Sequence, residues 1–265
     1  MNTYFICSDI HSFYDEWMAS IKDKGFDINN PSHKLIVCGD LFDRGNQTVE
    51  CYEFANDMIS RGRMTYVRGN HEYLLQQMMR EIKRGEDIRY HHVSNGTLHS
   101  FAQFMGVTEY DIICGTYTNS KFDATMNKVN EFIDTRCVNY FELGDFVFVH
   151  SWLPLTNDKT GVDPNWRSDY ADWYGATWGC PFDQWYMGAY LEDKTVVCGH
   201  WHTSYAHAKY NKDGSEWGKD ANFGIFMRSG IIGLDACTAH THKVNCLVIE
   251  ENENGTYNIR QENSN

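Results

Sequence analysis

Two carboxylates, an arginine and two glycines occur within seven residues, Gly39-Asp40-Leu41-Phe42-Asp43-Arg44-Gly45. They directly follow residues 34–38, an apolar run with the length and branching of a buried strand. A strand that ends in such groups builds a site rather than a core. Our hypothesis is that Asp40 bridges two metal ions, and that Asp43 and Arg44 serve a phosphate bound over them.

Four further apolar runs end in side chains that can coordinate metals. The residues are Asp9 with His11, Asn70, His150, and His200 with His202. A mixture of carboxylate, imidazole and amide oxygen suits Mn²⁺, Fe²⁺ or Zn²⁺ better than Ca²⁺. No thiolate is among the candidates, which argues against a structural zinc.

A pair of metal ions would use all of these ligands. Asp9 and His11, joined by His202, would complete the first ion, while Asn70, His150 and His200 would complete the second. Two ions roughly 3.5–4 Å apart can share a hydroxide and hold a phosphoryl oxygen. The expected reaction is therefore in-line attack of this bridging hydroxide on a phosphate ester.

The elements that must position these ligands repeat three times in the first eighty residues. Strands are predicted at 3–7, 35–38 and 64–67, and the helices that follow them at 13–24, 49–61 and 73–83. This order and a period of roughly thirty residues are typical of βαβ units. Because functional groups gather at the C-terminal ends of parallel strands, an α/β fold would bring the clusters to one edge.

The remainder of the chain is less regular. Residues 85–137 are interpreted as a helical insertion or cap, with helices at 99–105 and 121–134, and residues 151–190 as an aromatic-rich loop region. Further strands are predicted at 146–149, 195–198, 231–236 and 245–250, and the polar tail from 252 is expected to fray at its end. No linker-like stretch divides the chain, so 1–265 is interpreted as one domain.

Composition limits the classes of partner. Lys and Arg number 23 against 36 Asp and Glu, a net charge of −13, which disfavours nucleic acid as the main partner. Nine cysteines without a Cys-x-x-Cys pair favour reduced thiols and a cytoplasmic location. Cys7, Cys38 and Cys198 are interpreted as small strand hydrophobes. No secretory signal is expected, and no apolar run has the roughly 20 residues needed to cross a membrane.

The order of the motifs resembles that of the calcineurin-like metallophosphoesterase superfamily. The motifs are Asp9-x-His11, Gly39-Asp40-x-x-Asp43-Arg44-Gly45, Gly69-Asn70-His71-Glu72, His150 and Gly199-His200-x-His202. The second and third are most similar to the serine/threonine phosphoprotein phosphatase branch, with its bacterial and phage enzymes and the related diadenosine tetraphosphate hydrolases. The late 234–237 segment looks like the closing strand of that branch.

The resemblance implies a four-layer α-β-β-α sandwich of mixed sheets with a dinuclear metal site at the strand ends. It implies that His71 is the general acid, that Asp43 orients it, and that Arg44 and Arg68 bind the phosphate oxygens. Manganese is the expected metal, with iron, zinc or nickel as alternatives. The expected partner is a phosphorylated substrate, either a phosphoprotein or a small phosphoester or nucleotide.

Two departures from the branch leave the substrate class open. Ser151-Trp152 stands where the branch has two glycines, and Gly199-His200-Trp201-His202 where it has Gly-His-Thr, so a bulky Trp152 is expected to narrow the site. Phosphomonoester hydrolysis is the first hypothesis. The alternative is a nucleotide pyrophosphohydrolase or phosphodiesterase, in which the aromatics of 166–186 stack on a base instead of packing in the core.

Six other histidines do not close a predicted strand. We therefore expect them on the surface or in loops, with His240 or His242 able to line the rim of the pocket. This set comprises His91, His92, His99, His207, His240 and His242.

Overall fold

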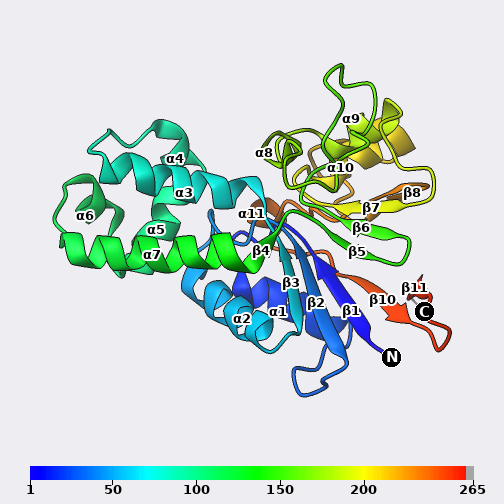
Figure 1. Cartoon of the computed structure of the whole chain (residues 1–265), viewed down its shortest axis with the longest axis horizontal. Helices are drawn as coiled ribbons and strands as arrows, with labels where there is room; N and C mark the ends of the chain where they lie inside the picture. Colours follow the sequence, from blue (N-terminus) through cyan, green and yellow to red (C-terminus); the bar gives the residue numbers. More distant parts are fainter. Residues whose placement is uncertain (261–265) are drawn as a thin grey trace.

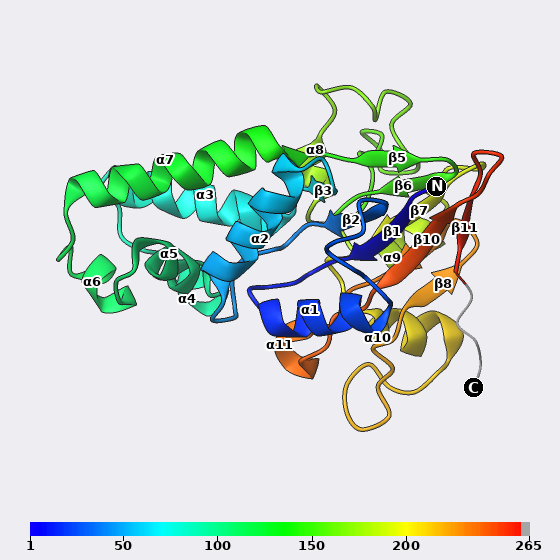
Figure 2. The same cartoon turned by 90° about the horizontal axis from the view of Figure 1, so that it is seen from below.

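The computed structural model describes residues 1–260, in which two mixed β-sheets pack face to face (Figures 1 and 2). The first sheet has six strands in the order β11-β10-β1-β2-β3-β4, and the second has five in the order β5-β6-β7-β9-β8. The strands of the first sheet are β1 (Thr3–Cys7), β2 (His33–Cys38), β3 (Met64–Val67), β4 (Cys137–Val138), β10 (Leu247–Glu251) and β11 (Tyr257–Ile259). Those of the second are β5 (Phe141–Leu143), β6 (Phe146–Phe148), β7 (Thr195–Cys198), β8 (Phe226–Arg228) and β9 (Ile231–Gly233).

The predicted βαβ units are confirmed. Strand β1 pairs in parallel with β2, and β2 in parallel with β3. The intervening helices are α1 (Tyr14–Asp23) and α2 (Thr48–Ser60), and α3 (Asn70–Lys83) follows β3. Helix α3 begins at Asn70 rather than at the predicted residue 73, because Gly69 is its N-cap and the Glu72 carboxylate accepts from the Gly69 N–H. The chemistry of this segment therefore lies in the first turn of a helix.

Three apolar cores fill the layers. The alternation of strand side chains sends Phe5 and Cys7 toward α1 and α2, while Ile6 enters the space between the sheets. The third core covers the outer face of the second sheet with α8 (Trp173–Ala176), α9 (Pro181–Tyr186) and α10 (Thr203–Ala206). The layers thus follow the predicted helix–sheet–sheet–helix order. Cys7, Cys38 and Cys198 are fully buried strand residues, as predicted.

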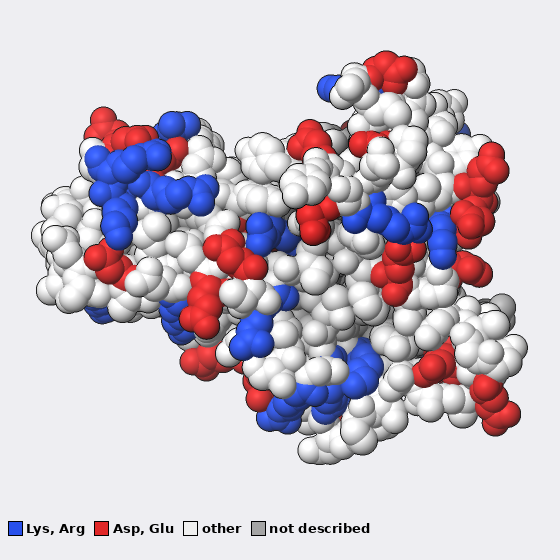
Figure 3. Space-filling view, viewed as in Figure 1, with Lys and Arg blue, Asp and Glu red and all other residues white. Residues whose placement is uncertain are grey.

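Residues 85–137 form a helical lobe beside the first sheet (Figures 1 and 2). Its helices are α4 (Tyr90–Ser94), α5 (Thr97–Met105), α6 (Glu109–Ile113) and α7 (Asn119–Arg136), and the C-terminal half of α3 packs among them. The two predicted helices of this region correspond to α5 and α7. Figure 3 shows basic and acidic groups interspersed over this face, rather than the continuous basic stripe of a nucleic-acid binder.

The aromatic-rich region divides into two groups. Trp152, Trp166 and Trp173 are buried in the third core, whereas Tyr174 and Trp178 are exposed. Trp152 is 2% exposed and its indole N–H donates to the Ala189 carbonyl, so the expectation that it narrows the site is wrong. The tryptophan turns into the core because its apolar rings find a hydrophobic pocket and its N–H finds an acceptor there.

The C-terminal segment adds an edge strand to the first sheet. Residues 252–256 turn the chain so that β11 pairs antiparallel with β10, while 261–265 lie outside the described residues. The remaining elements are the π-helix η1 (His207–Asn211) and the helix α11 (Thr238–Thr241). Within residues 1–260, none of the helices is both long enough and apolar enough to cross a bilayer.

Candidate metal centre

The loops that follow the parallel strands converge at one edge of the two sheets. Asp9 and His11 follow β1, Asp40 follows β2, and Asn70 opens the helix after β3. From the second sheet, His150 follows β6 and His200 follows β7. Strand β6 pairs in parallel with β7, so both loops leave the sheet on the same side. The strand ends therefore lie together at one edge, as the sequence predicts.

The backbone of these loops is strained where the candidate ligands stand. Eleven non-glycine residues in the described chain have positive φ, and six of them are predicted site residues. These six are Asp9, His11, Asp40, Asp43, Arg44 and His200. Left-handed conformations cost free energy in residues with a side chain and concentrate at functional sites. The left-handed backbone conformations of these loops thus direct the side chains toward the site, at the expense of regular secondary structure.

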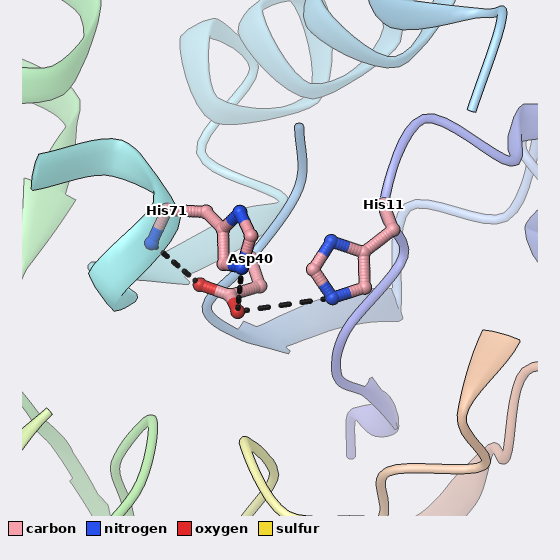
Figure 4. Close-up of side chains that lie close together, drawn as sticks. All are labelled: His11, Asp40 and His71. Carbon is pink, nitrogen blue, oxygen red and sulfur yellow. Dashed lines mark hydrogen bonds and ion pairs between the residues drawn. The ribbon is translucent and has the colours of Figure 1, made fainter. Parts of the chain in front are cut away.

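Asp40 lies between two groups of candidate ligands. The first group is His11, Asp40 and His71, whose ring nitrogens Nε2 each lie 3.8 Å from Asp40 Oδ2 (Figure 4). Asp9 adjoins this group, with Oδ1 4.0 Å from His11 Nε2. The second group is Asp40, His150 and His200, and there His150 Nε2 lies 3.4 Å from the other carboxylate oxygen, Oδ1. Each oxygen of Asp40 therefore faces a different group.

Asn70 completes the second group. Its Oδ1 lies 2.8 Å from His150 Nε2 and 2.9 Å from His200 Nδ1, and the two ring nitrogens lie 3.2 Å apart. Ligands bound tetrahedrally at about 2.1 Å would stand about 3.4 Å from one another. The donor atoms are therefore close to the spacing that one divalent ion requires.

Hydrogen bonds to the backbone fix the histidine tautomers. His11 Nδ1 donates to the Phe42 carbonyl at 3.0 Å and His150 Nδ1 to the Cys38 carbonyl at 2.9 Å. Nε2 of His11 and Nε2 of His150 therefore carry lone pairs, and both nitrogens face Asp40. In His200 the nitrogen that faces the site is Nδ1, 2.9 Å from Asn70 Oδ1. This arrangement is common in metal sites, where the outer hydrogen bond orients the ligand, and the residues present thus fit two divalent cations.

His202 and Arg68 have other contacts. His202 Nδ1 bonds to Ser204 Oγ at 2.9 Å and its Nε2 lies 3.4 Å from Glu216, so the structure does not bring it to the ligand groups. The Arg68 guanidinium donates to the Ile133 carbonyl at 2.7 Å and covers the ring of Tyr73. Their roles as ligand and as phosphate binder stay predictions.

His71 and Asp43 form a closed pair beside the ligands. His71 Nδ1 lies 2.7 Å from Asp43 Oδ2, and because a carboxylate only accepts, this nitrogen carries the proton. Burial opposes protonation of His71, but Asp40 and Asp43 outweigh it and raise the pKa of the imidazole. Arg44 is exposed, and its guanidinium lies 3.4 Å from His71 Nε2. The His71–Asp43 pair and the Arg44 guanidinium thus lie side by side next to the candidate ligands.

Glu72 anchors the backbone beneath the ligands. Its carboxylate accepts from the N–H groups of Gly69 at 2.8 Å, Asp40 at 3.1 Å and Leu41 at 3.1 Å. The strand end of β2 and the start of α3 are thereby fixed to each other.

A further carboxylate, which our sequence analysis did not assign to the site, lies at the same edge. Asp235 follows β9, which is parallel to β7, and burial raises its pKa to about 6. Burial, then Asp235 and Asp40, also raise the pKa of Asp9 well above its usual range. A bound divalent cation would lower both values by favouring the charged carboxylates. The signal was available, because Asp235 directly follows the apolar run 231–234.

Gly39 allows the strand ends to approach closely, and its replacement provides a first prediction. It has φ +83°, and a Cβ on it would lie 2.3 Å from His150 Nδ1 and 2.8 Å from the Gly69 Cα. We expect Gly39→Ala to lower the free energy of unfolding by about 2 to 4 kcal/mol in urea titrations, through backbone strain and overpacking. The matched control is Gly85→Ala, with φ +74° and no atom within 4 Å of its Cβ. A cost of about 1 kcal/mol for both variants would contradict close packing at Gly39.

The fold and the site together define a class of protein. The family model for calcineurin-like phosphoesterase matches residues 3–244, and the chain belongs to this family. The chain is therefore in a family of hydrolases that act on phosphate esters and depend on two metal ions.

Comparison with individual proteins adds two observations. The chain is 42% identical over 74 residues to the asymmetrical bis(5'-nucleosyl)-tetraphosphatase PrpE of Bacillus subtilis, and 39% identical over 74 residues to that of Bacillus velezensis. Each match covers 26% of this chain and 30% of the relative, so it spans less than a third of these curated proteins. The crystal structure of a cold-active protein-tyrosine phosphatase of a psychrophilic Shewanella species is similar in fold. It has a TM-score of 0.50 and 13% identity, and the match covers 98% of this chain and 81% of that one.

Proposed function

We propose that this protein is a dinuclear-metal-dependent phosphoesterase that hydrolyses phosphomonoesters in the manner of serine/threonine phosphoprotein phosphatases. The observation that carries the proposal is the position of Asp40, which directs one oxygen to each of two ligand groups beside the His71–Asp43 pair. Two adjacent cation sites next to a buried acid are the parts that in-line phosphoryl transfer to water requires.

The chain's own residues would divide the work as follows. Asp40, with Asp9 and His11 on one side and Asn70, His150 and His200 on the other, would hold the cations. Manganese is the metal that we propose for this mixed oxygen and nitrogen set. When bound, the cations would supply an activated water and stabilise charge on the phosphoryl group.

The proton of the leaving group would come from His71. Because Asp43 holds Nδ1, the opposite nitrogen Nε2 faces the site and can protonate the departing oxygen. The Arg44 guanidinium, 3.4 Å from Nε2, would bind phosphate oxygens and so place the leaving oxygen next to the acid. Among residues 1–260 no carboxylate forms an ion pair with Arg44, which would keep its donors available to substrate.

A second candidate substrate class is nucleotides. Half-buried Tyr73, two residues after His71, contacts Tyr174 edge to face at a centroid distance of 5.1 Å, and Tyr174 contacts Trp178 at 6.0 Å. Tyr174 is 54% and Trp178 39% exposed, beside the His200 end of the site. Exposed aromatic rings can stack on a nucleobase, and the similarity to the tetraphosphatases is compatible with such a substrate.

One experiment separates the two classes. The Mn²⁺-loaded protein would be assayed with a phosphopeptide, p-nitrophenyl phosphate and diadenosine tetraphosphate. If nucleotides are the substrate, Tyr174→Ala should lower the ratio of kcat/KM for diadenosine tetraphosphate over p-nitrophenyl phosphate by about tenfold, through lost stacking. Tyr110→Ala, on an exposed residue of α6, is the matched control. An unchanged ratio would favour phosphomonoesters, and no turnover of any compound would contradict the proposed function.

A further inference from the structure

His92 is not the surface histidine that its sequence context indicates. Its side chain is 0% exposed, on the short helix α4 of the helical lobe. Its Nε2 lies 3.0 Å from Oε2 of Glu81, which is itself 2% exposed and receives further bonds from Gln77 and Arg89. The ordinary explanation is a buried pair that fixes α4 to α3. That explanation does not account for the other ring nitrogen of His92, Nδ1, which is buried as well.

The protonation of this pair can be worked out from its contacts. Burial opposes ionisation of Glu81, but the bonds from Gln77, His92 and Arg89 outweigh it and lower the pKa of the carboxyl. Burial also lowers the pKa of His92. Because the ionised carboxylate only accepts, the neutral ring carries its hydrogen on Nε2. Nδ1 of His92 is therefore a hydrogen-bond acceptor.

Asp43 is the carboxylate of the candidate site that influences His92 electrostatically. Its Oδ2 accepts from His71 Nδ1 and from Thr97 Oγ1, both at 2.7 Å. Thr97 is the first residue of α5. A Cβ on the preceding Gly96 would lie 2.4 Å from the backbone nitrogen of Arg44. The junction of α4 and α5 thus packs directly on the Asp43 turn, and His92 interacts electrostatically with Asp43.

Two buried acceptors remain at this junction. Asp43 Oδ1 and His92 Nδ1 are both buried and have no hydrogen-bond partner among residues 1–260. Two acceptors cannot satisfy each other, and a buried acceptor without a donor costs free energy. A water molecule has two hydrogens and commonly bridges buried polar groups of this kind. One donor with two hydrogens would satisfy both atoms.

We propose that His92 is a positioning residue for His71, acting through one buried water that donates to His92 Nδ1 and to Asp43 Oδ1. The chain of contacts then runs from Glu81 through His92, the water and Asp43 to the proposed acid. The water holds the Asp43 carboxylate in the rotamer whose Oδ2 accepts the hydrogen bond from His71 Nδ1. The helical lobe, through α4, thereby sets the orientation of the group that protonates the leaving oxygen.

This inference rests on the proposed function, and leaving-group dependence tests it. Phenyl phosphate needs protonation of its leaving oxygen more than p-nitrophenyl phosphate does, because phenolate is the stronger base. We expect His92→Phe to lower the ratio of kcat for phenyl over p-nitrophenyl phosphate about tenfold in Mn²⁺, with KM unchanged. His91→Phe, on the neighbouring half-buried ring, should leave the ratio as in wild type. A fall of equal size with both esters, or none, would overturn the proposal.

A spectroscopic measurement keeps the inference separate from the proposed function. In the metal-free protein, the proton between His71 and Asp43 should give a downfield NMR resonance that His92→Phe shifts and His91→Phe does not. If wild type hydrolyses neither ester, the proposed function fails, and this resonance alone decides the inference. An unshifted resonance would then overturn it.

A second variant covers the case in which His92→Phe does not fold. Glu81→Gln introduces an amide that can donate to His92 Nε2, which moves the ring hydrogen to Nδ1 and changes what Asp43 receives. The same fall in the ester ratio, or the same shift of the resonance, is expected. An unchanged ratio in an active Glu81→Gln protein would overturn the proposal.

Discussion

Asp40→Asn should reduce kcat for p-nitrophenyl phosphate in Mn²⁺ by between about a hundredfold and a thousandfold. The amide keeps the size of the side chain but loses the charge that faces both ligand groups, with contacts of 3.4 Å and 3.8 Å to the histidines on its two sides. It also presents one oxygen instead of two, so one group loses its shared ligand. The expected result is a protein that folds but does not hold a pair of ions.

Metal content and thermal stability measure directly whether Asp40→Asn still binds a pair of ions. In wild type, binding of the ions to the folded state alone should raise Tm as Mn²⁺ is added. We expect Asp40→Asn to lose most of this rise, while the Tm of the metal-free protein changes little because the buried shape is kept. Asp57→Asn, on an exposed residue of α2 paired with Arg61, should behave as wild type. Full activity of Asp40→Asn with two bound ions per chain would show that Asp40 is not the bridge.

His71→Asn should have the next largest effect, a fall in kcat of about 10² to 10⁴ with an ester of a poor leaving group. The imidazole is the group whose Nδ1 is fixed at 2.7 Å by Asp43 and whose Nε2 lies at 3.8 Å from Asp40 Oδ2. The amide cannot deliver a proton to the departing oxygen. The loss should be smaller with p-nitrophenyl phosphate, since p-nitrophenolate leaves more easily without protonation.

The comparison of kcat and metal content separates an acid from a ligand. His71 also belongs to the first group of candidate ligands, so a fall in bound metal in His71→Asn would assign the ring to the ion instead. We expect both ions to stay bound and KM to change little. His242→Asn, on an exposed ring 66% accessible, is the matched control. Near-normal turnover of both esters by His71→Asn would contradict the assignment as the acid.

Several features of the fold follow from local sequence alone. The strands 3–7, 64–67 and 195–198 are predicted at the bounds that the structure has, because each is a short apolar run that ends in a polar turn. The convergence of Asp9, Asp40 and Asn70 also follows, since consecutive parallel strands deliver their C-terminal residues to one edge. His150 and His200 belong to the second sheet, so their meeting with the first three depends on how the two sheets pack.

Other features depend on contacts that adjacent residues do not encode. Strands β4, β5 and β11 are too short to show an apolar pattern of their own. They are strands because they pair with neighbouring strands of the sheets. Trp152 follows a site residue in the chain, yet its ring enters the core because a pocket and the Ala189 carbonyl are available there. His202 matches a superfamily motif, but its ring is held by Ser204 and Glu216.

The sequence by itself determined the family of the chain, the edge of the sheet that carries the site, and Asp40 at its centre. These depend on residue type and spacing, which the chain displays directly. Only the tertiary structure decided which oxygen of Asp40 faces which histidine, and that Asp235 and the buried His92 lie near the reacting groups. Side-chain direction and burial arise when segments distant in sequence pack together, and 52 residues of chain separate Asp40 from His92. The His91-His92 pair in a helical insertion gives no sign that His92 is buried against Glu81 until α4 packs in the lobe.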